Sequence, residues 1–134
     1  MKKLTLFILF FCLILTGCNK SEPKKTHLDE ISEKNKITIG IRVDAKPFGF
    51  VQNGEFRGFD VDIAKSVSEN IFGDNSIEHI EFIPLKPSER ISALTQKRVD
   101  LVIAAFSINN KRKTVIDFSN PYYVAGQALM VPKA

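Results

Sequence analysis

The sequence predicts an α/β domain with a mainly parallel sheet and flanking helices, and three observations lead to this class. From residue 37 onward, segments alternate in the order strand, helix, strand, helix, strand. The run at 99–106 (Val-Asp-Leu-Val-Ile-Ala-Ala-Phe) is typical of a parallel strand covered on both faces. Ile63, Val67 and Ile71 recur every four residues, which indicates the buried face of a helix.

The first predicted elements of this domain are a strand and a small hairpin. Residues 37–42 alternate apolar and other side chains, as a strand with one buried face does. Residues 47–51 and 54–56 surround the turn sequence Gln-Asn-Gly at 52–54, which favours a hairpin.

The helix and the remaining elements follow the hairpin. The helix is expected to begin at Asp60, acting as its N-cap, and to stop at Gly73. Residues 77–85 return to strand character, and Pro-Ser at 87–88 opens a short second helix. After the apolar run, residues 127–131 are expected to form a last strand.

The first 17 residues have the pattern of a bacterial secretory signal. Two lysines precede an apolar run at 4–15 that is too short to span a bilayer comfortably as a helix. The run ends in Leu-Thr-Gly-Cys, which resembles the bacterial lipobox, where a lipid is attached to the cysteine and the chain is cut just before it. We therefore predict a lipoprotein signal peptide at 1–17 and a lipid on Cys18. A plain secretory signal that contains a cysteine is the alternative.

Processing at this point limits charge and cysteine chemistry. It would leave 117 residues, enough for one domain, with 17 basic against 15 acidic residues. This small excess gives nucleic-acid binding little support. Cys12 would leave with the signal and Cys18 would be acylated, so no disulfide is expected in the mature chain. Residues 18–36 are expected to form a solvated, lipidated tether with a short helix around 28–34, and 37–134 the globular part.

Two strand ends indicate where a ligand would bind. In an open parallel sheet, ligands collect at the carboxyl ends of the strands. Arg42 follows the first predicted strand, and Ser107 follows the apolar run. The sequence therefore places a basic side chain and a hydroxyl at one edge of the sheet.

Four segments together resemble the bacterial extracellular solute-binding proteins of family 3, which bind amino acids. They are residues 47–50 (Pro-Phe-Gly-Phe), 58–64 (Gly-Phe-Asp-Val-Asp-Ile-Ala), 98–104 (Arg-Val-Asp-Leu-Val-Ile-Ala), and Arg-Lys at 112–113 leading into Ile-Asp-Phe-Ser-Asn-Pro-Tyr-Tyr at 116–123. The resemblance implies a periplasmic-binding-protein-like (type II) fold, in which two α/β lobes close around the ligand. Residues 37–134 would be an incomplete first lobe, with the second lobe absent.

The resemblance also implies a function and partners. The chain would be the extracytoplasmic substrate-binding lipoprotein of an amino-acid ABC uptake transporter, in the periplasm or on the outer face of the cell membrane. Its partners would be a small amino acid, the permease subunits and, through Cys18, the membrane. No cofactor, no nucleic acid and no enzymatic activity are expected.

The resemblance assigns three positions to the backbone of the ligand. Arg112 would clamp the α-carboxylate, a role suited to the planar, permanently charged guanidinium. Ser107 would bind the same carboxylate through its hydroxyl and N–H, and the carbonyl of Ala105 would accept from the ligand ammonium. The alternatives are a solvated basic turn around Arg112 and a strand end that merely turns into a loop.

Two further arginines would read the ligand side chain. Arg42 and Arg90 fall at family positions that face the distal end of the ligand. Two guanidinium groups in one cleft repel each other unless an anion lies between them, which favours glutamate or aspartate. A different polar amino acid such as glutamine is the alternative ligand, and either arginine pointing into solvent is the alternative structure.

Other readings of the chain remain open. The same fold serves as a dehydratase of prephenate-like substrates, as a regulatory lobe of cell-wall lyases and as a sensor domain, and the chain is alternatively a truncated inactive product. Phe48, Phe50, Phe56 and Phe59 are expected to pack in the core and hairpin. Asp60 is expected to cap a helix and Asp62 to lie on the surface of that helix. Tyr122 and Tyr123 are expected to pack under the site. Neither histidine, His27 or His79, lies in a metal-ligand pattern.

The lipobox-like sequence gives a direct test of membrane attachment. A fatty-acid probe fed to expressing cells is expected to label the wild-type protein and to leave Cys18→Ala unlabelled. Because each buried methylene contributes only roughly 0.8 kcal/mol, stable anchoring needs several acyl chains on this residue. Equal labelling of both proteins would show that Cys18 carries no lipid.

Overall fold

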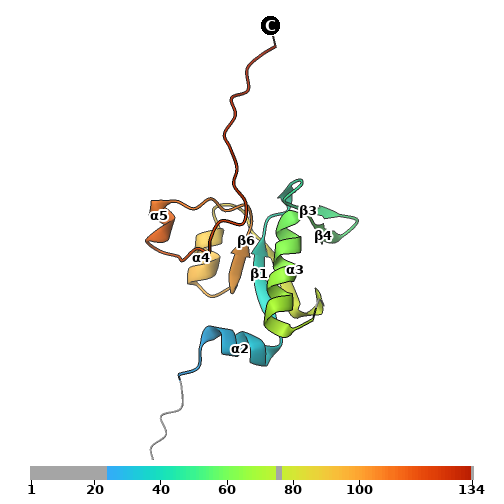
Figure 1. The fold of residues 1–134 in the computed structure, drawn as a ribbon, viewed down its shortest axis with the longest axis vertical. Helices are drawn as coiled ribbons and strands as arrows, with labels where there is room; N and C mark the ends of the chain where they lie inside the picture. The colour runs from blue at the N-terminus through green and yellow to red at the C-terminus, as the bar shows by residue number, and fades with distance from the viewer. Residues whose placement is uncertain (1–23, 75–76, 134) are drawn as a thin grey trace, which may run out of the picture.

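The computed structural model describes residues 24–74 and 77–133, and its centre is a parallel sheet. Strand β1 (Ile37–Ile41) lies between β5 (Ile80–Pro84) and β6 (Leu101–Ile103), and both pairings are parallel. The carboxyl ends of all three strands therefore meet at one edge, which we call the carboxyl edge; helix α2 (His27–Lys34) lies at the opposite edge (Figure 1). The predicted α/β architecture is confirmed.

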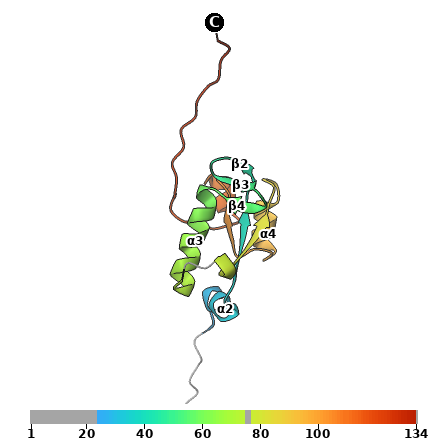
Figure 2. The ribbon, with the colours of Figure 1, turned by 90° about the vertical axis from the view of Figure 1, so that its right-hand side faces the viewer.

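Two helices cover opposite faces of the sheet (Figure 2). The apolar side chains therefore form two clusters, one on each face. Helix α3 (Phe59–Phe72) covers one face with the side chains predicted from its four-residue repeat. Helix α4 (Arg90–Thr95) covers the other. The α3 cluster contains Ile37, Ile39, Ile80 and Ile103. The α4 cluster contains Ile83, Leu85 and Val102, whose side chains point to the other face because successive residues of a strand alternate.

The start of α3 differs from the prediction. Gly58 is the N-cap, in a backbone conformation with φ of 115° and ψ of 176°. Asp60 therefore lies inside the first turn and is buried, with 0% exposure, so the prediction that it caps the helix is wrong. Asp62 lies on the exposed surface, and Gly73 ends the helix in the left-handed conformation, as predicted.

A small antiparallel sheet packs beside the start of α3. It consists of β2 (Asp44–Ala45), β3 (Gly49–Gln52) and β4 (Glu55–Arg57), and the predicted hairpin is its β3–β4 pair. The loop before β3 accepts two hydrogen bonds from α3: Phe59 N donates to Pro47 O at 3.0 Å, and Asp60 N donates to Phe48 O at 2.9 Å. These bonds fix the hairpin relative to the parallel sheet.

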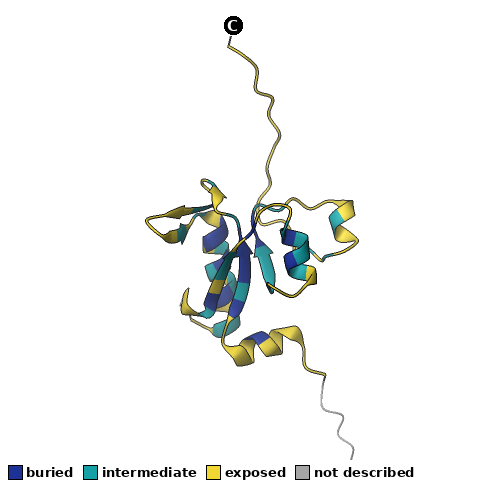
Figure 3. Ribbon diagram, turned by 180° about the vertical axis from the view of Figure 1, so that it is seen from behind, coloured by how far each residue is buried: buried dark blue, intermediate teal, exposed yellow. Residues whose placement is uncertain are grey.

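Helix α2 is packed on the domain rather than solvated along its whole length. Thr26 and Asp29 form a capping box at its start. Ile31 is buried, with 7% exposure, and joins the α3 cluster, which Figure 3 shows as one buried turn in an exposed helix. The expectation of a solvated tether is therefore wrong for this part of residues 18–36, while residues 1–23, with the predicted signal and Cys18, lie outside the described residues.

The other elements depart from the prediction in three places. Residues 77–79 form a 3₁₀ turn, η1 (Ile77–His79), before β5. Strand β6 is shorter than the apolar run that predicts it, because the backbone turns at Ala105, where φ is 46°. The predicted strand at 127–131 is wrong: Leu129 and Met130 are 97% and 98% exposed, and no neighbouring strand in the described part of the chain pairs with this segment. In 24–74 and 77–133, no helix has the length and apolar character needed to cross a membrane.

The conformation of Gly58 gives a stability test of the junction between hairpin and helix. A Cβ at this position would collide with the Pro47 and Phe48 carbonyl oxygens, and the backbone region is nearly exclusive to glycine. Gly58→Ala is expected to lower the free energy of unfolding, measured in urea, by about 1–3 kcal/mol or more. Gly126→Ala, at a site with no atom within 4 Å of the added carbon, serves as the control. Equal stability of the two variants would contradict the assignment.

Candidate functional site

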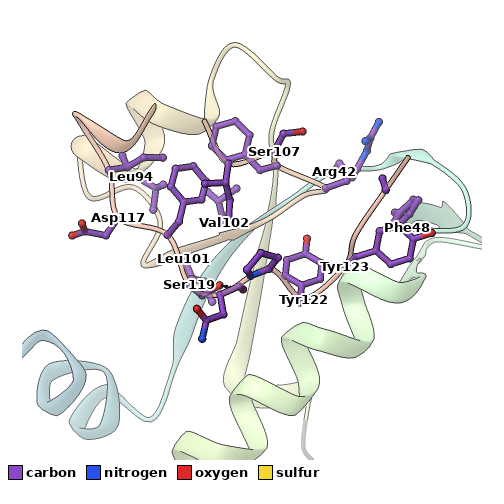
Figure 4. A pocket seen from close by; sticks show the side chains of 18 of the residues that line it. Arg42, Phe48, Leu94, Leu101, Val102, Ser107, Asp117, Ser119, Tyr122 and Tyr123 are labelled. Carbon is purple, nitrogen blue, oxygen red and sulfur yellow. Dashed lines mark hydrogen bonds between the residues drawn. The ribbon is translucent and has the colours of Figure 1, made fainter. Parts of the chain in front are cut away.

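A cavity of about 780 Å³ opens at the carboxyl edge of the parallel sheet. Its walls come from β6 and α4 on one side and from residues 115–125 on the other (Figure 4). Phe48, from the loop before β3, lines its rim together with Arg42 and Ser107. The cavity therefore lies where the parallel topology predicts a ligand site.

Three of the predicted ligand-binding residues line this cavity directly. Arg42 follows β1, and Ala105 and Ser107 follow β6, so the pairing of these strands brings the three together. Arg42 is partly neutralised, since its Nε donates to Asp44 Oδ1 at 3.0 Å. The left-handed turn at Ala105 places Ser107 beyond the end of the strand.

Arg112 lies beside Ser107. It belongs to the short helix α5 (Asn110–Lys113), whose N-cap Asn109 accepts from Arg112 N at 2.9 Å. The Arg112 guanidinium donates to the backbone carbonyl of Ser107 and stacks on Phe106, with 4.1 Å between Cζ and the ring centroid. Arg112 is thus held by backbone and ring contacts beside Ser107 and Phe106, which line the cavity, whereas neither Arg112 nor Arg90 lines it directly.

Arg90 approaches the same aromatic ring from α4. Its Cζ lies 5.5 Å from the Phe106 centroid, and the residue is only 5% exposed. Its Nε has no hydrogen-bond partner among the described residues. Burial lowers the pKa of Arg90, and the positive charges of Arg42 and Arg112 lower it further, against the opposing effects of Asp44 and Asp60. The alternative of an exposed Arg90 is therefore wrong; the side chain is a buried cation surrounded by other cations.

Asp60 and Tyr122 form a polar pair between α3 and the cavity. The Tyr122 hydroxyl, on the cavity wall, donates to Asp60 Oδ1 at 3.1 Å. Burial raises the pKa of Asp60, although the Tyr122 hydrogen bond, the charge of Arg42 and a backbone hydrogen bond from Ala105 oppose the rise. Burial and the Asp60 carboxylate raise the pKa of Tyr122 to about 12.

Sequence reasoning missed the part that Asp60 and Phe48 play in this region. Phe48 lines the cavity and also packs edge-on against Tyr123, with centroids 5.0 Å apart, rather than serving only the hairpin core. The available signal for Phe48 was its place six residues after the predicted strand at 37–42, on the same edge of the sheet. Asp60 had no such signal, because the position of the true N-cap decides which side of the first turn is buried.

The charges of the site favour an anion. Three guanidinium groups lie near Phe106 and the end of β1, those of Arg42, Arg90 and Arg112. The carboxylates of Asp44 and Asp60 offset part of their charge. A bound carboxylate would relieve the cost of burying unpaired positive charge. In the part of the chain that the structure describes, no group of three His, Cys, Asp or Glu side chains is arranged to hold a metal ion.

The Tyr122 and Asp60 pair gives a pH-dependent stability test. Tyr122→Phe removes a donor from a buried carboxyl group, which typically costs about 1–3 kcal/mol of unfolding free energy. The Tyr122 hydrogen bond lowers the pKa of Asp60, which burial raises, so the bond stabilises the ionised carboxylate more than the protonated acid. Without the bond the pKa of Asp60 rises further, and more stability is lost as the pH rises through that pKa. The deficit of the variant is therefore expected to be larger at neutral pH than at acidic pH in urea unfolding followed by circular dichroism. Tyr123→Phe, which keeps its ring contact, is the control; an equal loss in both variants would contradict the role of Tyr122.

Comparison with known proteins identifies the family of this chain. The profile of the family described as bacterial extracellular solute-binding proteins, family 3, matches residues 37–134. The ABC transporter glutamine-binding protein GlnH of Bacillus subtilis (strain 168) is 35% identical over 140 residues, covering 97% of this chain and 50% of the relative. The glutamate-binding protein GluB of Corynebacterium efficiens is 32% identical over 122 residues, covering 89% of this chain and 41% of the relative.

A solved structure shows the same architecture in a single domain. The arginine-bound form of domain 1 from TmArgBP, an arginine-binding protein of T. maritima, superposes with a TM-score of 0.65 at 33% identity, covering 71% of this chain and 72% of that domain. The predicted type II periplasmic-binding-protein fold is thereby confirmed. The chain spans about half or less of the length of these curated relatives, which are named as binding proteins. The chain belongs to the bacterial extracellular solute-binding proteins of family 3.

Proposed function

We propose that this chain is the first lobe of the extracytoplasmic substrate-binding component of an amino-acid ABC transporter. The observation that carries the proposal is the position of Arg112, whose guanidinium contacts Ser107 at the rim of the cavity. A guanidinium beside a serine, whose hydroxyl is a further donor, is suited to an α-carboxylate, which accepts several charge-assisted hydrogen bonds at once.

The roles of the three rim residues follow from this position. Arg112 would give two parallel hydrogen bonds to the α-carboxylate, and its stacking on Phe106 would limit the entropy lost on binding. Ser107 would add its hydroxyl. Ala105 is left with its backbone carbonyl as acceptor for the ligand ammonium, so its methyl group has no assigned role.

The side chain of the ligand would be read by Arg90 and Arg42. Arg90 is the stronger candidate, because its Nε is buried and unpartnered in the described chain. Arg42 contributes less charge than expected, since Asp44 already accepts from its Nε. A second carboxylate on the ligand would stabilise this pair, which supports glutamate or aspartate as the ligand.

Glutamine is the second candidate ligand, and it too has an observation in its favour. Asp44 and Asp60 offset part of the charge of the three arginines, so an α-carboxylate could balance much of the rest without an acidic side chain. The resemblance to the glutamine-binding protein GlnH supports this alternative. An enzymatic role has weaker support: an ancestral cyclohexadienyl dehydratase superposes with a TM-score of 0.68 at 30% identity, but the curated relatives named above are binding proteins.

The expected partners follow from the family. Permease subunits would receive the loaded protein, and a lipid on Cys18 would hold it at the membrane. Nucleic acid and cofactors have no part in the proposal. The arginine-bound domain 1 of TmArgBP supports ligand binding by one lobe alone, so the 134-residue chain is itself a suitable protein for the test, although we expect weak binding.

Calorimetric titration with a panel of amino acids tests the proposal. Glutamate and aspartate are expected to bind at least tenfold more tightly than glutamine or asparagine. Arg112→Ala removes the partner of a charged carboxylate, which typically costs about 2–5 kcal/mol, and should weaken every ligand by at least tenfold. Arg90→Ala should reduce the preference for acidic ligands more than it reduces general affinity.

Lys113→Ala is the matched control for these variants. It removes an exposed cation of the same helix that carries Arg112, so it separates a specific contact from general charge attraction. If Lys113→Ala weakens binding as much as Arg112→Ala, the carboxylate role of Arg112 is wrong. If glutamine binds more tightly than glutamate and aspartate, the assignment of the side-chain pocket to Arg90 and Arg42 is wrong, while the family-level function stands.

A further inference from the structure

Both histidines of the chain lie between α2 and the domain, at the amino ends of the parallel strands. His27 is the first residue of α2, and His79 is the last residue of η1. Figure 1 shows α2 at the end of the parallel strands opposite to the hairpin, although Asp100, which His27 contacts, also lines the cavity. The inference drawn from these residues needs no assumption about the ligand.

His27 connects α2 to the segment that precedes β6. Its Nε2 lies 2.8 Å from Asp100 Oδ1, and its Nδ1 lies 3.3 Å from Glu30 Oε2 on the same helix. The Asp100 carboxylate is itself held in place, because its Oδ2 accepts from Thr38 N of β1 at 2.8 Å. The imidazole therefore faces two carboxylates, one on each side.

His79 connects η1 to the end of α2. Its Nδ1 lies 3.0 Å from the carbonyl oxygen of Asn35, the C-cap of α2, and its Nε2 lies 3.1 Å from Asp74 Oδ2. The ring stacks on Phe72 of α3, with centroids 4.6 Å apart and an interplanar angle of 24°. Its side chain is 14% exposed, so the position of the ring is well defined.

All four ring nitrogens thus face oxygen atoms that can only accept. A carbonyl oxygen and an ionised carboxylate have no proton to donate, and a neutral imidazole has one N–H and one bare nitrogen. In either neutral tautomer, each ring would turn a lone pair toward an acceptor. Only the doubly protonated imidazolium satisfies both contacts of each ring.

We propose that the contacts of His27 and His79 latch α2 on the lobe and that the latch is pH-sensitive at His79, whose protonated ring holds the end of α2 and whose neutral ring loosens it. The latch acts beside the burial of Ile31, a contact whose own strength does not depend on pH. Release of α2 would expose Ile31 and the edge of the α3 cluster. Helix α2, through which the chain enters the lobe, would then be held more tightly at low pH than at high pH.

The direction of the pH dependence follows from the acceptors around each ring. The Asn35 carbonyl, and then Asp74, raise the pKa of His79, while burial opposes them and Glu78 adds a smaller attraction. A histidine whose pKa is raised in the docked state stabilises that state below its ordinary pKa of about 6.5, and the stabilisation is lost as the pH rises through the raised value. Docking should therefore be tightest in acid.

The other charged groups near α2 are carboxylates and lysines. Glu30 and Asp100 face His27, and Asp74 and Glu78 face His79. Lys25 pairs with Glu33 at 2.6 Å on the exposed side of α2, and Asp29 belongs to the capping box. Histidine is the side-chain type that ordinarily changes charge near neutral pH, so the proposal assigns the response between about pH 5 and pH 8.5 to His79.

Methyl NMR of the full chain with labelled isoleucines tests the latch. The Ile31 signal, assigned from Ile31→Val, reports docking of α2, and the Ile39 signal at the centre of the sheet reports the integrity of the core. From about pH 5 to about pH 8.5, the Ile31 signal should move toward an exposed position while Ile39 stays unchanged. For His79, a pKa difference of even half a unit between the docked and released states gives about a threefold change in the docking constant.

Two variants complete the experiment. His27→Gln/His79→Gln leaves no histidine in the chain and should abolish the movement of the Ile31 signal. Asp74→Asn keeps both histidines but weakens the attraction for a protonated His79, so it should shift the transition to lower pH. The proposal is overturned if the wild-type Ile31 signal does not move, if the double variant moves as the wild type does, or if Asp74→Asn leaves the transition where it was.

Discussion

The parallel pairing of β1 with strands on both sides is the constraint on which the rest of the structure depends. The registers with β5 and β6 bring three strand ends to one edge, and α3 and α4 cover the two faces. Because the faces are closed by helices, polar ligands have access only at the edges of the sheet. The cavity at the carboxyl edge and α2 at the amino edge are both consequences of this arrangement.

Electrostatics at the carboxyl edge is dominated by the cost of burying like charges together. Phe106 separates Arg90 from Arg112 and offers each guanidinium a ring face, which is a modest stabilisation compared with the cost of desolvating an unpaired cation. Asp44 and Asp60 compensate from the side of the hairpin and α3. The site therefore retains an attraction for a carboxylate, which ties the choice of ligand to the balance of five charges.

The two edges use charge in opposite ways. At the carboxyl edge, the buried Arg90 Nε lacks an acceptor among the described residues, so an added anion should strengthen the structure. At the amino edge, acceptors face both ring nitrogens of His79, so the proposed role of an added proton is the same. Both cases follow from the cost of leaving a polar group unmatched.

The sequence by itself determined the elements whose signal is local. The four-residue repeat of α3, its stop at Gly73, the turn of the hairpin and the apolar run of β6 each reflect contacts within a few residues, and Arg42 and Ser107 could be placed at one edge because parallel strands align their ends. Tertiary structure alone decided the rest. Asp60 is buried because Gly58, not Asp60, caps α3; Arg90 is buried because α4 packs on the sheet; and residues 127–131 remain extended without a partner strand in the described chain. Burial and strand pairing depend on residues distant in sequence, and no local pattern specifies which distant residue will be there.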